Sequence, residues 1–417
     1  MFSWATKAVI LSELADRTES SEVEACAVVD SPVWSHIAQM LGSPDRQAQI
    51  CSCRLLGNLA WFKSTAPAIL ELKLCEQLVF LLDDNHSGVI REATAALTHL
   101  SRWVDGAKSV VDAKALDHVL ALLKSPESYI QRLACELAGN LALHESTAPA
   151  VLKLNPFVRL VSSLGDEDYV VCQATYALSQ IARWADGAKD LVDAKVLDHV
   201  LRLLESPNPD TQKWACKLIG NLASHKSTAR AILKLNLSMQ LVSLLGDEDL
   251  FSQAAYALSQ IADWVDGAKA VVDAGVLNHV LRLLESPNPD TQEWASKLTG
   301  NLASHEFTAP AILRLKLCEQ IVSLLGDRDS LVSWAAYALS RITYWVDGAK
   351  AVIDAKALDY VLPLLESPNP DTRGWACELT ANLAGHESTA PAILKANTSV
   401  QLVSLLGDEN SLVPWVI

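Results

Sequence analysis

The sequence predicts an all-α array of short helical repeats, and three observations lead to this fold class. The dipeptide Ser-Pro recurs in steps of 80 to 82 residues, at Ser43, Ser125, Ser206, Ser286 and Ser367. A second tag, Leu-Gly-Asp, recurs half-way between these positions, with its glycine at Gly165, Gly246, Gly326 and Gly407. Between the tags, apolar residues follow the 3.6-residue period of amphipathic helices. The repeating unit is therefore about 40 residues long and occurs in two alternating types.

The first type, which begins at the Ser-Pro tag, divides into three expected helices. Asn208 is a good N-cap for a long helix, and Pro209 suits its first position, where the missing N–H has no consequence. This helix is expected to run to about Ser224. The pair Ser227-Thr228 is expected to cap a short helix, and a third helix is predicted over 239–245.

The second type, which begins at the Gly-Asp tag, has the same plan with a different junction. Its long helix is followed by the sequence WVDG, in which Asp266 is the expected cap of the short helix. Gly267 and its equivalents mark helix junctions. Both types therefore contain a long, a short and a medium helix.

This three-helix unit resembles the armadillo repeat. The segments ALSQIA and LIGNLA are similar to the core of that repeat, and AVVDAGVLNHVLRLL is similar to its following segment. The resemblance implies a right-handed α-solenoid (superhelix) of about nine to ten repeats. It divides a single solenoid over 1–417 into a partial repeat (1–42), nine repeats (43–406) and a truncated repeat (407–417). HEAT repeats are the alternative, but they have two helices per unit and lack the recurring asparagine.

Composition limits the kinds of partner and location that we expect for this chain. The chain has 34 basic and 49 acidic residues, a formal net charge of -15. An acidic surface repels phosphates, so we expect protein partners and no nucleic acid. No stretch approaches the roughly 18 apolar residues of a membrane span. The nine cysteines fall mostly in apolar helical patterns, which favours a reduced cytoplasmic or nuclear location.

Neither a metal site nor a catalytic site is expected. Histidine recurs four residues after the asparagine of the LxGNLA segment, at His144, His225, His305 and His386. These residues are two repeats apart, roughly 20 Å at the spacing of packed helices, and cannot share an ion. Ser, His and Asp recur in every repeat, whereas a catalytic triad is one local constellation. We therefore predict a protein that is not an enzyme and holds no cofactor.

The candidate binding residues come from the resemblance. In armadillo proteins the long helix lines a concave groove, and its asparagine binds the backbone of an extended peptide. The matching positions are Asn58, Asn140, Asn221, Asn301 and Asn382, with His99, Gln180, Gln260 and Arg341 in the second type. A carboxamide offers donors and an acceptor together, so it can bracket one peptide unit. The other interpretation is that the asparagine caps a neighbouring carbonyl.

Aromatic residues recur on the same helix face. They are Tyr176, Tyr256 and Tyr337, one turn before the Gln or Arg; Trp214, Trp294 and Trp375, seven residues before the asparagine; and Trp103, Trp184, Trp264 and Trp345, one turn after the second-type position. Aromatic side chains supply contact area at low entropic cost. For the last set, wedging between repeats is an equally good interpretation.

Two functions remain open. The favoured one is a scaffold or adaptor that captures an extended, disordered segment of a partner in the groove. The alternative is a cargo receptor of the importin-α kind. That family spaces a groove tryptophan four residues before the asparagine, where this chain has Arg54, Glu136, Lys217, Lys297 and Glu378. The basic arm of importin-α is also missing, because the first forty residues hold only Lys7 and Arg17 as strong bases.

Overall fold

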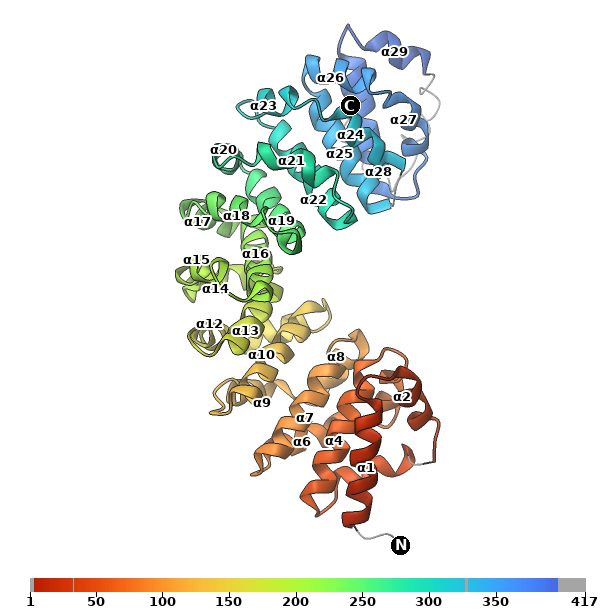
Figure 1. Ribbon diagram of the computed structural model, residues 1–417, viewed down its shortest axis with the longest axis vertical. Helices are drawn as coiled ribbons and strands as arrows, with labels where there is room; N and C mark the ends of the chain where they lie inside the picture. Colours follow the sequence, from red (N-terminus) through yellow and green to blue (C-terminus); the bar gives the residue numbers. More distant parts are fainter. Residues whose placement is uncertain (1–3, 33, 327–328, 397–417) are drawn as a thin grey trace. The chain divides into compact units, whose positions relative to one another are not determined.

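The computed structural model describes residues 4–32, 34–326 and 329–396, and within these ranges it contains helices and no strand. The truncated repeat predicted over 407–417 lies outside the described residues. A long helix followed by two shorter helices repeats along the chain (Figure 1). The three-helix unit predicted from the sequence is therefore confirmed. The expected order of a short helix before a medium one is wrong, because in every described unit that has both, the second helix is as long as the third or longer.

The long helices are the first of each unit. They are α1 (Trp4–Thr18), α4 (Arg46–Trp61), α7 (Ser87–Leu100), α10 (Ser128–Leu143), α13 (Asp168–Ile181), α16 (Pro209–Ser224), α19 (Phe251–Ala262), α22 (Pro289–Ala303), α25 (Asp329–Thr343) and α28 (Pro370–Gly385).

Two shorter helices follow each of the first nine, and one follows α28 within the described residues. The second helices are α2 (Glu22–Val29), α5 (Ala66–Glu71), α8 (Val104–Asp112), α11 (Ala148–Leu154), α14 (Ala185–Asp193), α17 (Lys226–Lys234), α20 (Val265–Asp273), α23 (Ala309–Arg314), α26 (Val346–Asp354) and α29 (Ala390–Lys395). The third helices are α3 (Ile37–Leu41), α6 (Cys75–Phe80), α9 (Leu116–Leu122), α12 (Phe157–Ser162), α15 (Val200–Leu204), α18 (Ser238–Leu244), α21 (Leu277–Leu284), α24 (Cys318–Ser323) and α27 (Leu358–Leu365).

The chain forms two compact units, Met1–Leu218 and Ile219–Ile417, whose boundary falls inside α16. In the first unit α1, α4, α7, α10 and α13 pack in succession, each against the next (Figure 1). In the second unit α19, α22, α25 and α28 do the same. Leucine and alanine of the long helices, such as Leu137 and Leu258, are fully buried between neighbours. Each repeat therefore completes its core with side chains of the adjacent ones.

The start of the long helices is as predicted. Asn208 Oδ1 accepts hydrogen bonds from the backbone N–H of Asp210 (2.9 Å) and of Thr211 (3.2 Å). α16 begins at Pro209. Asn288 and Asn369 cap α22 and α28 in the same way. These caps satisfy N–H groups that have no partner inside the helix.

The expected caps of the short helices are wrong. Thr228 makes no cap for α17, which begins at Lys226; its hydroxyl donates instead to Leu222 O at 2.5 Å. It thereby satisfies one of the last carbonyl groups of α16, which lack partners within the helix. Asp266 lies in the first turn of α20, and the N-cap residue is Trp264.

The junction between the second and third helices uses the left-handed backbone region. Lys195 has φ 67°, Asn236 φ 50° and Gly275 φ 91° at equivalent points of successive repeats. This region strains residues that carry a Cβ and is tolerated best by glycine and asparagine. The lysines at this junction therefore hold strained backbone.

Candidate functional site

The recurring asparagines join neighbouring long helices. Asn140 Nδ2 donates to Thr98 O at 2.9 Å, and Asn301 Nδ2 donates to Ser259 O at 2.7 Å. Asn58 and Asn382 donate in the same way to the carbonyls of Ala15 (2.8 Å) and Ser340 (2.9 Å). Each acceptor belongs to the last turn of the preceding long helix, where carbonyl groups lack a partner within the helix. Of the two interpretations that the sequence left open, the structure shows the inter-repeat contact.

The acceptor end of the same carboxamide is used by a tyrosine of the next repeat. Tyr176 Oη donates to Asn140 Oδ1 at 2.7 Å, and Tyr337 Oη donates to Asn301 Oδ1 at 2.5 Å. Tyr256 makes the equivalent bond to Asn221. Asn140 and Asn301 are only 3% and 1% exposed. To contact a partner's backbone, these two carboxamides would have to give up bonds within the stack.

The glycine before each of these asparagines makes room for the tyrosine ring. A Cβ at Gly139 would lie 2.6 Å from Tyr176 Cε1, and one at Gly300 would lie 2.6 Å from Tyr337 Cε1. Only a residue without a Cβ allows this approach. Burial raises the pKa of Tyr176 to about 12, so its hydroxyl stays protonated and can donate. The glycine, asparagine and tyrosine therefore form one inter-repeat contact, which we call the Gly-Asn-Tyr clamp.

The predicted tryptophans at Trp214, Trp294 and Trp375 meet these tyrosines edge to face. The ring centroids of Tyr176 and Trp214 are 4.7 Å apart with an interplanar angle of 63°. The pairs Tyr256–Trp294 and Tyr337–Trp375 repeat this distance of 4.7 Å. All three tryptophans are half-buried. Aromatic pairs favour this geometry, so the rings are held in fixed positions with part of their surface in solvent.

In the second unit these pairs join into a continuous row over α19, α22, α25 and α28. Trp334 of α25 links them, with its ring 6.4 Å from Trp294 and 5.6 Å from Tyr337. Its indole N–H donates to Glu293 Oε1 at 3.1 Å. We call Tyr256, Trp294, Trp334, Tyr337 and Trp375 the aromatic row. Trp334 was not predicted from the sequence, because the equivalent positions Glu92, Gln173 and Gln253 carry no aromatic ring; a counterpart, Trp415, lies outside the described residues.

Cations of the chain cover the ring faces of the row. Lys297 Nζ lies 4.7 Å from the centroid of Trp334 and 5.7 Å from that of Trp294, and burial lowers its pKa. The Arg341 guanidinium lies 5.1 Å from Tyr337 and 5.3 Å from Trp375. It also forms a 2.8 Å ion pair with Glu378. Arg341, predicted as a groove residue, is therefore on this surface and already paired.

The last set of tryptophans fastens adjacent repeats. Their indole N–H groups donate to carbonyls near the end of the preceding long helix: Trp103 to Ala60 (2.9 Å), Trp184 to Ala142 (2.8 Å), Trp264 to Ala223 (2.8 Å) and Trp345 to Ala303 (2.7 Å). Of the two interpretations of this set, the structure shows packing between repeats. Gln180 and Gln260 are 7% and 8% exposed and offer little surface to a partner.

A hollow of about 370 Å³ lies on the long helices of the first unit, between α4 and α7. Its lining includes Asn58 and Trp61 of α4 and Ala95 and His99 of α7. The ring of Trp61 is 5.1 Å from that of His99, and the Arg102 guanidinium lies 3.7 Å above it. Burial lowers the pKa of His99. Nothing in the sequence near these residues predicts a hollow here.

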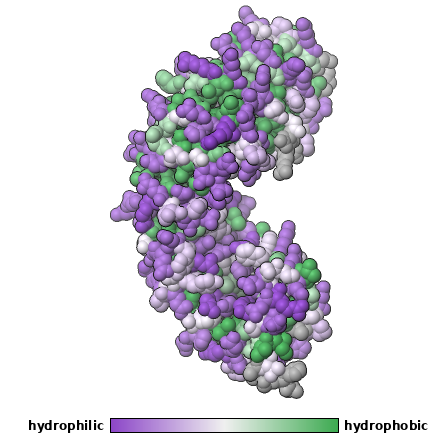
Figure 2. Space-filling model, viewed as in Figure 1, coloured by the Kyte–Doolittle hydropathy of each residue, from purple (hydrophilic) through white to green (hydrophobic). Residues whose placement is uncertain are grey.

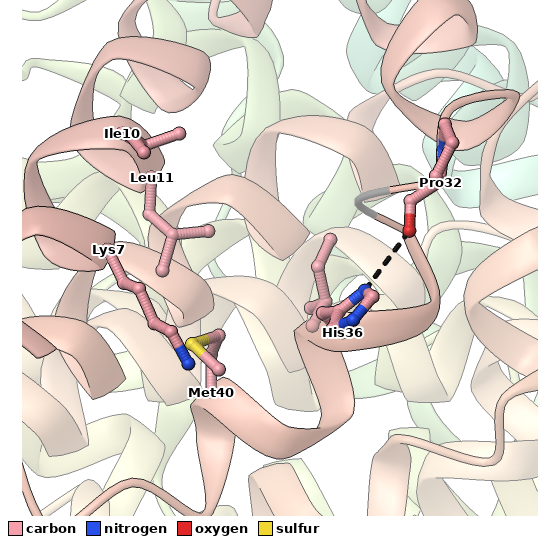
Figure 3. Close-up of a pocket in the computed structure, with 7 residues that line it drawn as sticks. Lys7, Ile10, Leu11, Pro32, His36 and Met40 are labelled. Atoms are coloured by element: carbon pink, nitrogen blue, oxygen red, sulfur yellow. Dashed lines mark hydrogen bonds between the residues drawn. The ribbon is translucent and has the colours of Figure 1, made fainter. Parts of the chain in front are cut away.

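A second hollow of about 350 Å³ lies at the N-terminal end of the described chain (Figure 3). Lys7, Ile10 and Leu11 of α1 face Met40 of α3 across it, and His36 Nδ1 lies 3.1 Å from Pro32 O. Its lining is almost wholly apolar. By contrast, hydrophilic side chains cover most of the molecular face in Figure 2, with apolar ones gathered in patches.

The described residues contain no group of three His, Cys, Asp or Glu side chains placed to hold a metal ion. The described helices also include none of the length and apolarity that crossing a bilayer requires.

Comparison with known proteins agrees with the helical architecture. A family model of the Armadillo/beta-catenin-like repeat matches residues 185–224. Importin subunit alpha-1b of Oryza sativa subsp. japonica is 23% identical over 242 residues, which are 46% of this chain and 45% of the rice protein. The match thus spans less than half of that relative's length.

Two solved structures of engineered proteins from the Northeast Structural Genomics Consortium are similar in fold. The first is 28% identical, has a TM-score of 0.75, and aligns 92% of this chain with 96% of its own. The second is also 28% identical, has a TM-score of 0.51, and aligns 54% of this chain with 97% of its own.

Proposed function

Because this chain is an armadillo-type repeat protein, we propose that it is a non-catalytic scaffold or adaptor that captures an extended, disordered segment of a partner protein. The aromatic row of the second unit is the observation that carries the proposal. Its rings follow one another over four successive long helices, and Trp294 and Trp375 keep part of their surface in solvent.

Fixed aromatic rings suit this task. Each ring is already locked by an edge-to-face contact, so binding immobilises little further side-chain freedom. Tryptophan and tyrosine are also the side chains that most often dominate binding energy at protein interfaces. The row therefore provides anchors whose positions are set before the partner arrives.

The partner segment should be extended, since the anchors repeat with the helices. Packed helices lie about 10 Å apart, and an extended chain advances about 3.3 Å per residue, so one repeat spans roughly three residues. A segment of about twelve residues would cross the four helices of the row. Such a segment has no fold of its own to protect, which favours a disordered region.

The cations of the row bear on the alternative, a cargo receptor for basic signals. Lys297 and Arg341 already occupy the ring faces where a partner lysine would gain a cation–π contact. A basic segment would meet like charge at these points, whereas carboxylate or aromatic side chains would not. We therefore favour a scaffold in the cytoplasm or nucleus over a receptor for basic cargo.

Selection from a displayed library of random peptides of about twelve residues, the length worked out above, tests the proposal. Replacing Trp294 and Trp375 together by alanine should weaken the selected peptides at least tenfold, since each buried anchor contributes about 2 kcal/mol or more. Phe307→Ala is the matched control, because Phe307 is 78% exposed and lies off the row in the turn after α22. Affinities are measured by titration calorimetry, with helical content checked by circular dichroism.

Equal loss in the control and the double variant would contradict the proposal, as would a folded double variant with normal affinity. Replacing the recurring asparagines is a poorer test. Asn301 is 1% exposed and bonded at both ends of its carboxamide, so its removal perturbs the stack itself. A selection that yields only lysine-rich peptides would favour the cargo receptor.

A further inference from the structure

The hollow between α4 and α7 occupies the place of a missing tyrosine. The second-type long helices carry equivalent residues at Ala95, Tyr176, Tyr256 and Tyr337, in steps of 81, 80 and 81. Three of these four residues complete a Gly-Asn-Tyr clamp with the preceding long helix. The fourth, Ala95 of α7, has no ring to place on Gly57 and no hydroxyl to offer Asn58.

The missing tyrosine changes the surroundings of both Gly57 and Asn58. A Cβ at Gly57 would meet no atom nearer than 3.6 Å, whereas one at Gly139 would meet the Tyr176 ring at 2.6 Å. Asn58 Nδ2 still donates to Ala15 O at 2.8 Å, as in the complete clamps. Among the described residues no hydrogen bond reaches Asn58 Oδ1, and this side chain is half-buried where Asn140 is 3% exposed. The hollow thus combines a ring-shaped space with a vacant acceptor.

The walls favour an uncharged aromatic guest. Trp61 and Tyr129, which are 45% and 46% exposed, supply aromatic surface at the edge of the hollow. The charged lining residues are Glu19, Glu92 and Arg54, and Arg54 is already paired with Asp16 at 2.6 Å. A doubly charged phosphate would meet these carboxylates and an acceptor oxygen, with no unpaired cation to balance it.

We propose that this hollow, which we call the Ala95 pocket, receives an unphosphorylated tyrosine side chain of the captured partner segment. The ring lies on Gly57, and the phenol hydroxyl donates to Asn58 Oδ1. The partner thereby completes the one clamp that is open among the described residues. This inference rests on the proposed function for the source of the tyrosine, but the pocket can be tested without any peptide.

The direct probe is p-cresol, the side chain of tyrosine as a free molecule, with toluene as the comparison that lacks the hydroxyl. The full-length protein is labelled with ¹⁵N, and the Trp61 indole signal is assigned from its loss in Trp61→Phe. We expect p-cresol to shift this signal saturably, and toluene to bind at least tenfold more weakly, because it leaves Asn58 Oδ1 covered and unpaired.

Two matched variants test the pocket: one fills the open clamp at Ala95, and the other opens the filled clamp at Tyr176. Ala95→Tyr fills the pocket as Tyr176 fills its own clamp, so it should abolish the p-cresol shift and raise the melting temperature. Tyr176→Ala opens the clamp over Gly139 and should add a second p-cresol site, seen at the Trp214 indole. If Ala95→Tyr does not fold, Ala95→Leu occupies the ring space without the hydroxyl and should also abolish the shift.

A peptide arm connects the pocket with the partner. Its peptides are selected on the Trp294→Ala/Trp375→Ala variant, because a segment of about twelve residues that crosses the four helices of the aromatic row does not include α4 or α7. These peptides should lose at least tenfold in affinity when their anchoring tyrosine becomes phenylalanine or phosphotyrosine, and when Ala95→Tyr is added to the variant. An unchanged Trp61 signal at saturating p-cresol, or equal binding by Ala95→Tyr, overturns the pocket. If p-cresol binds but the affinity of the peptides is the same on Ala95→Tyr, the pocket exists and the partner does not place a tyrosine in it. Failure to select any peptide on the native protein contradicts the proposed function, and the cresol result still judges the pocket.

Discussion

Removing one hydroxyl from a complete clamp should loosen two neighbouring repeats. In Tyr176→Phe the ring stays over Gly139, but the 2.7 Å bond to Asn140 Oδ1 is lost. Asn140 is 3% exposed, so water cannot easily replace the hydroxyl. A buried acceptor left without a partner costs about 1–3 kcal/mol. At 1.4 kcal/mol per factor of ten, this corresponds to a roughly 5- to 150-fold larger equilibrium constant for local opening.

Hydrogen exchange of the α10 and α13 amides is the suitable assay, because a repeat array opens locally and one global unfolding energy is poorly defined. Tyr169→Phe is the matched control on the same helix, since Tyr169 is 42% exposed. It should change local stability by no more than about 0.5 kcal/mol. If the two variants exchange alike, the clamp does not hold the repeats together.

A double-mutant cycle isolates the bond itself. Asn140→Ala removes the acceptor and also the donor to Thr98 O, so it should cost more than Tyr176→Phe. The double variant should be less destabilised than the sum of the singles, with a coupling of about 0.5–3 kcal/mol for residues in contact. Strict additivity would show that the hydroxyl and the carboxamide contribute independently.

Two further predictions concern the backbone and pH. Lys195→Gly should stabilise its repeat by about 0.5–1 kcal/mol, because glycine relieves the left-handed strain but loses more entropy on folding. Gly275→Lys should destabilise its repeat by a similar amount, and hydrogen exchange of the two repeats should show changes of opposite sign. Burial lowers the pKa of His99 below its ordinary 6.5, so the unfolded chain binds the proton first as the pH falls. Stability should therefore drop as the pH falls below about 6.5, and His99→Gln should flatten this part of the pH profile in denaturant titrations; a slope unchanged by the variant would exclude His99 as its source.

The features that the sequence predicted well are local or periodic. The caps at Asn208 and its equivalents depend on residues within a few positions of each other, and the repeat length follows from tags that recur along the chain. The short-helix caps were wrong because these helices begin earlier than the capping residues suggested. Thr228 lies inside the first turn of α17, which begins at Lys226, and its hydroxyl donates to the carbonyl of Leu222 at the end of the preceding helix.

The candidate site was harder to predict, because the roles of its residues depend on contacts some 40 positions away. Nothing in the sequence near Asn140 shows that Thr98 and Tyr176 engage both ends of its carboxamide. Trp334 was overlooked because three of the equivalent positions, Glu92, Gln173 and Gln253, carry no aromatic ring. The Ala95 pocket is marked by the absence of a ring, and that absence is meaningful only once the role of Tyr176 is known.

These outcomes change where binding residues should be sought in a chain of closely similar repeats. A residue that recurs at every repeat faces the same neighbours each time, so inter-repeat packing is sufficient to explain it; Asn140 and Trp184 are examples. A partner segment does not repeat, and its recognition needs positions that differ along the array. Ala95 and Trp334 are such positions, one opening a pocket and the other joining two aromatic pairs into a row. If recognition follows the exceptions, exchanging Ala95 for the recurrent tyrosine should alter which segments bind while leaving the stack intact.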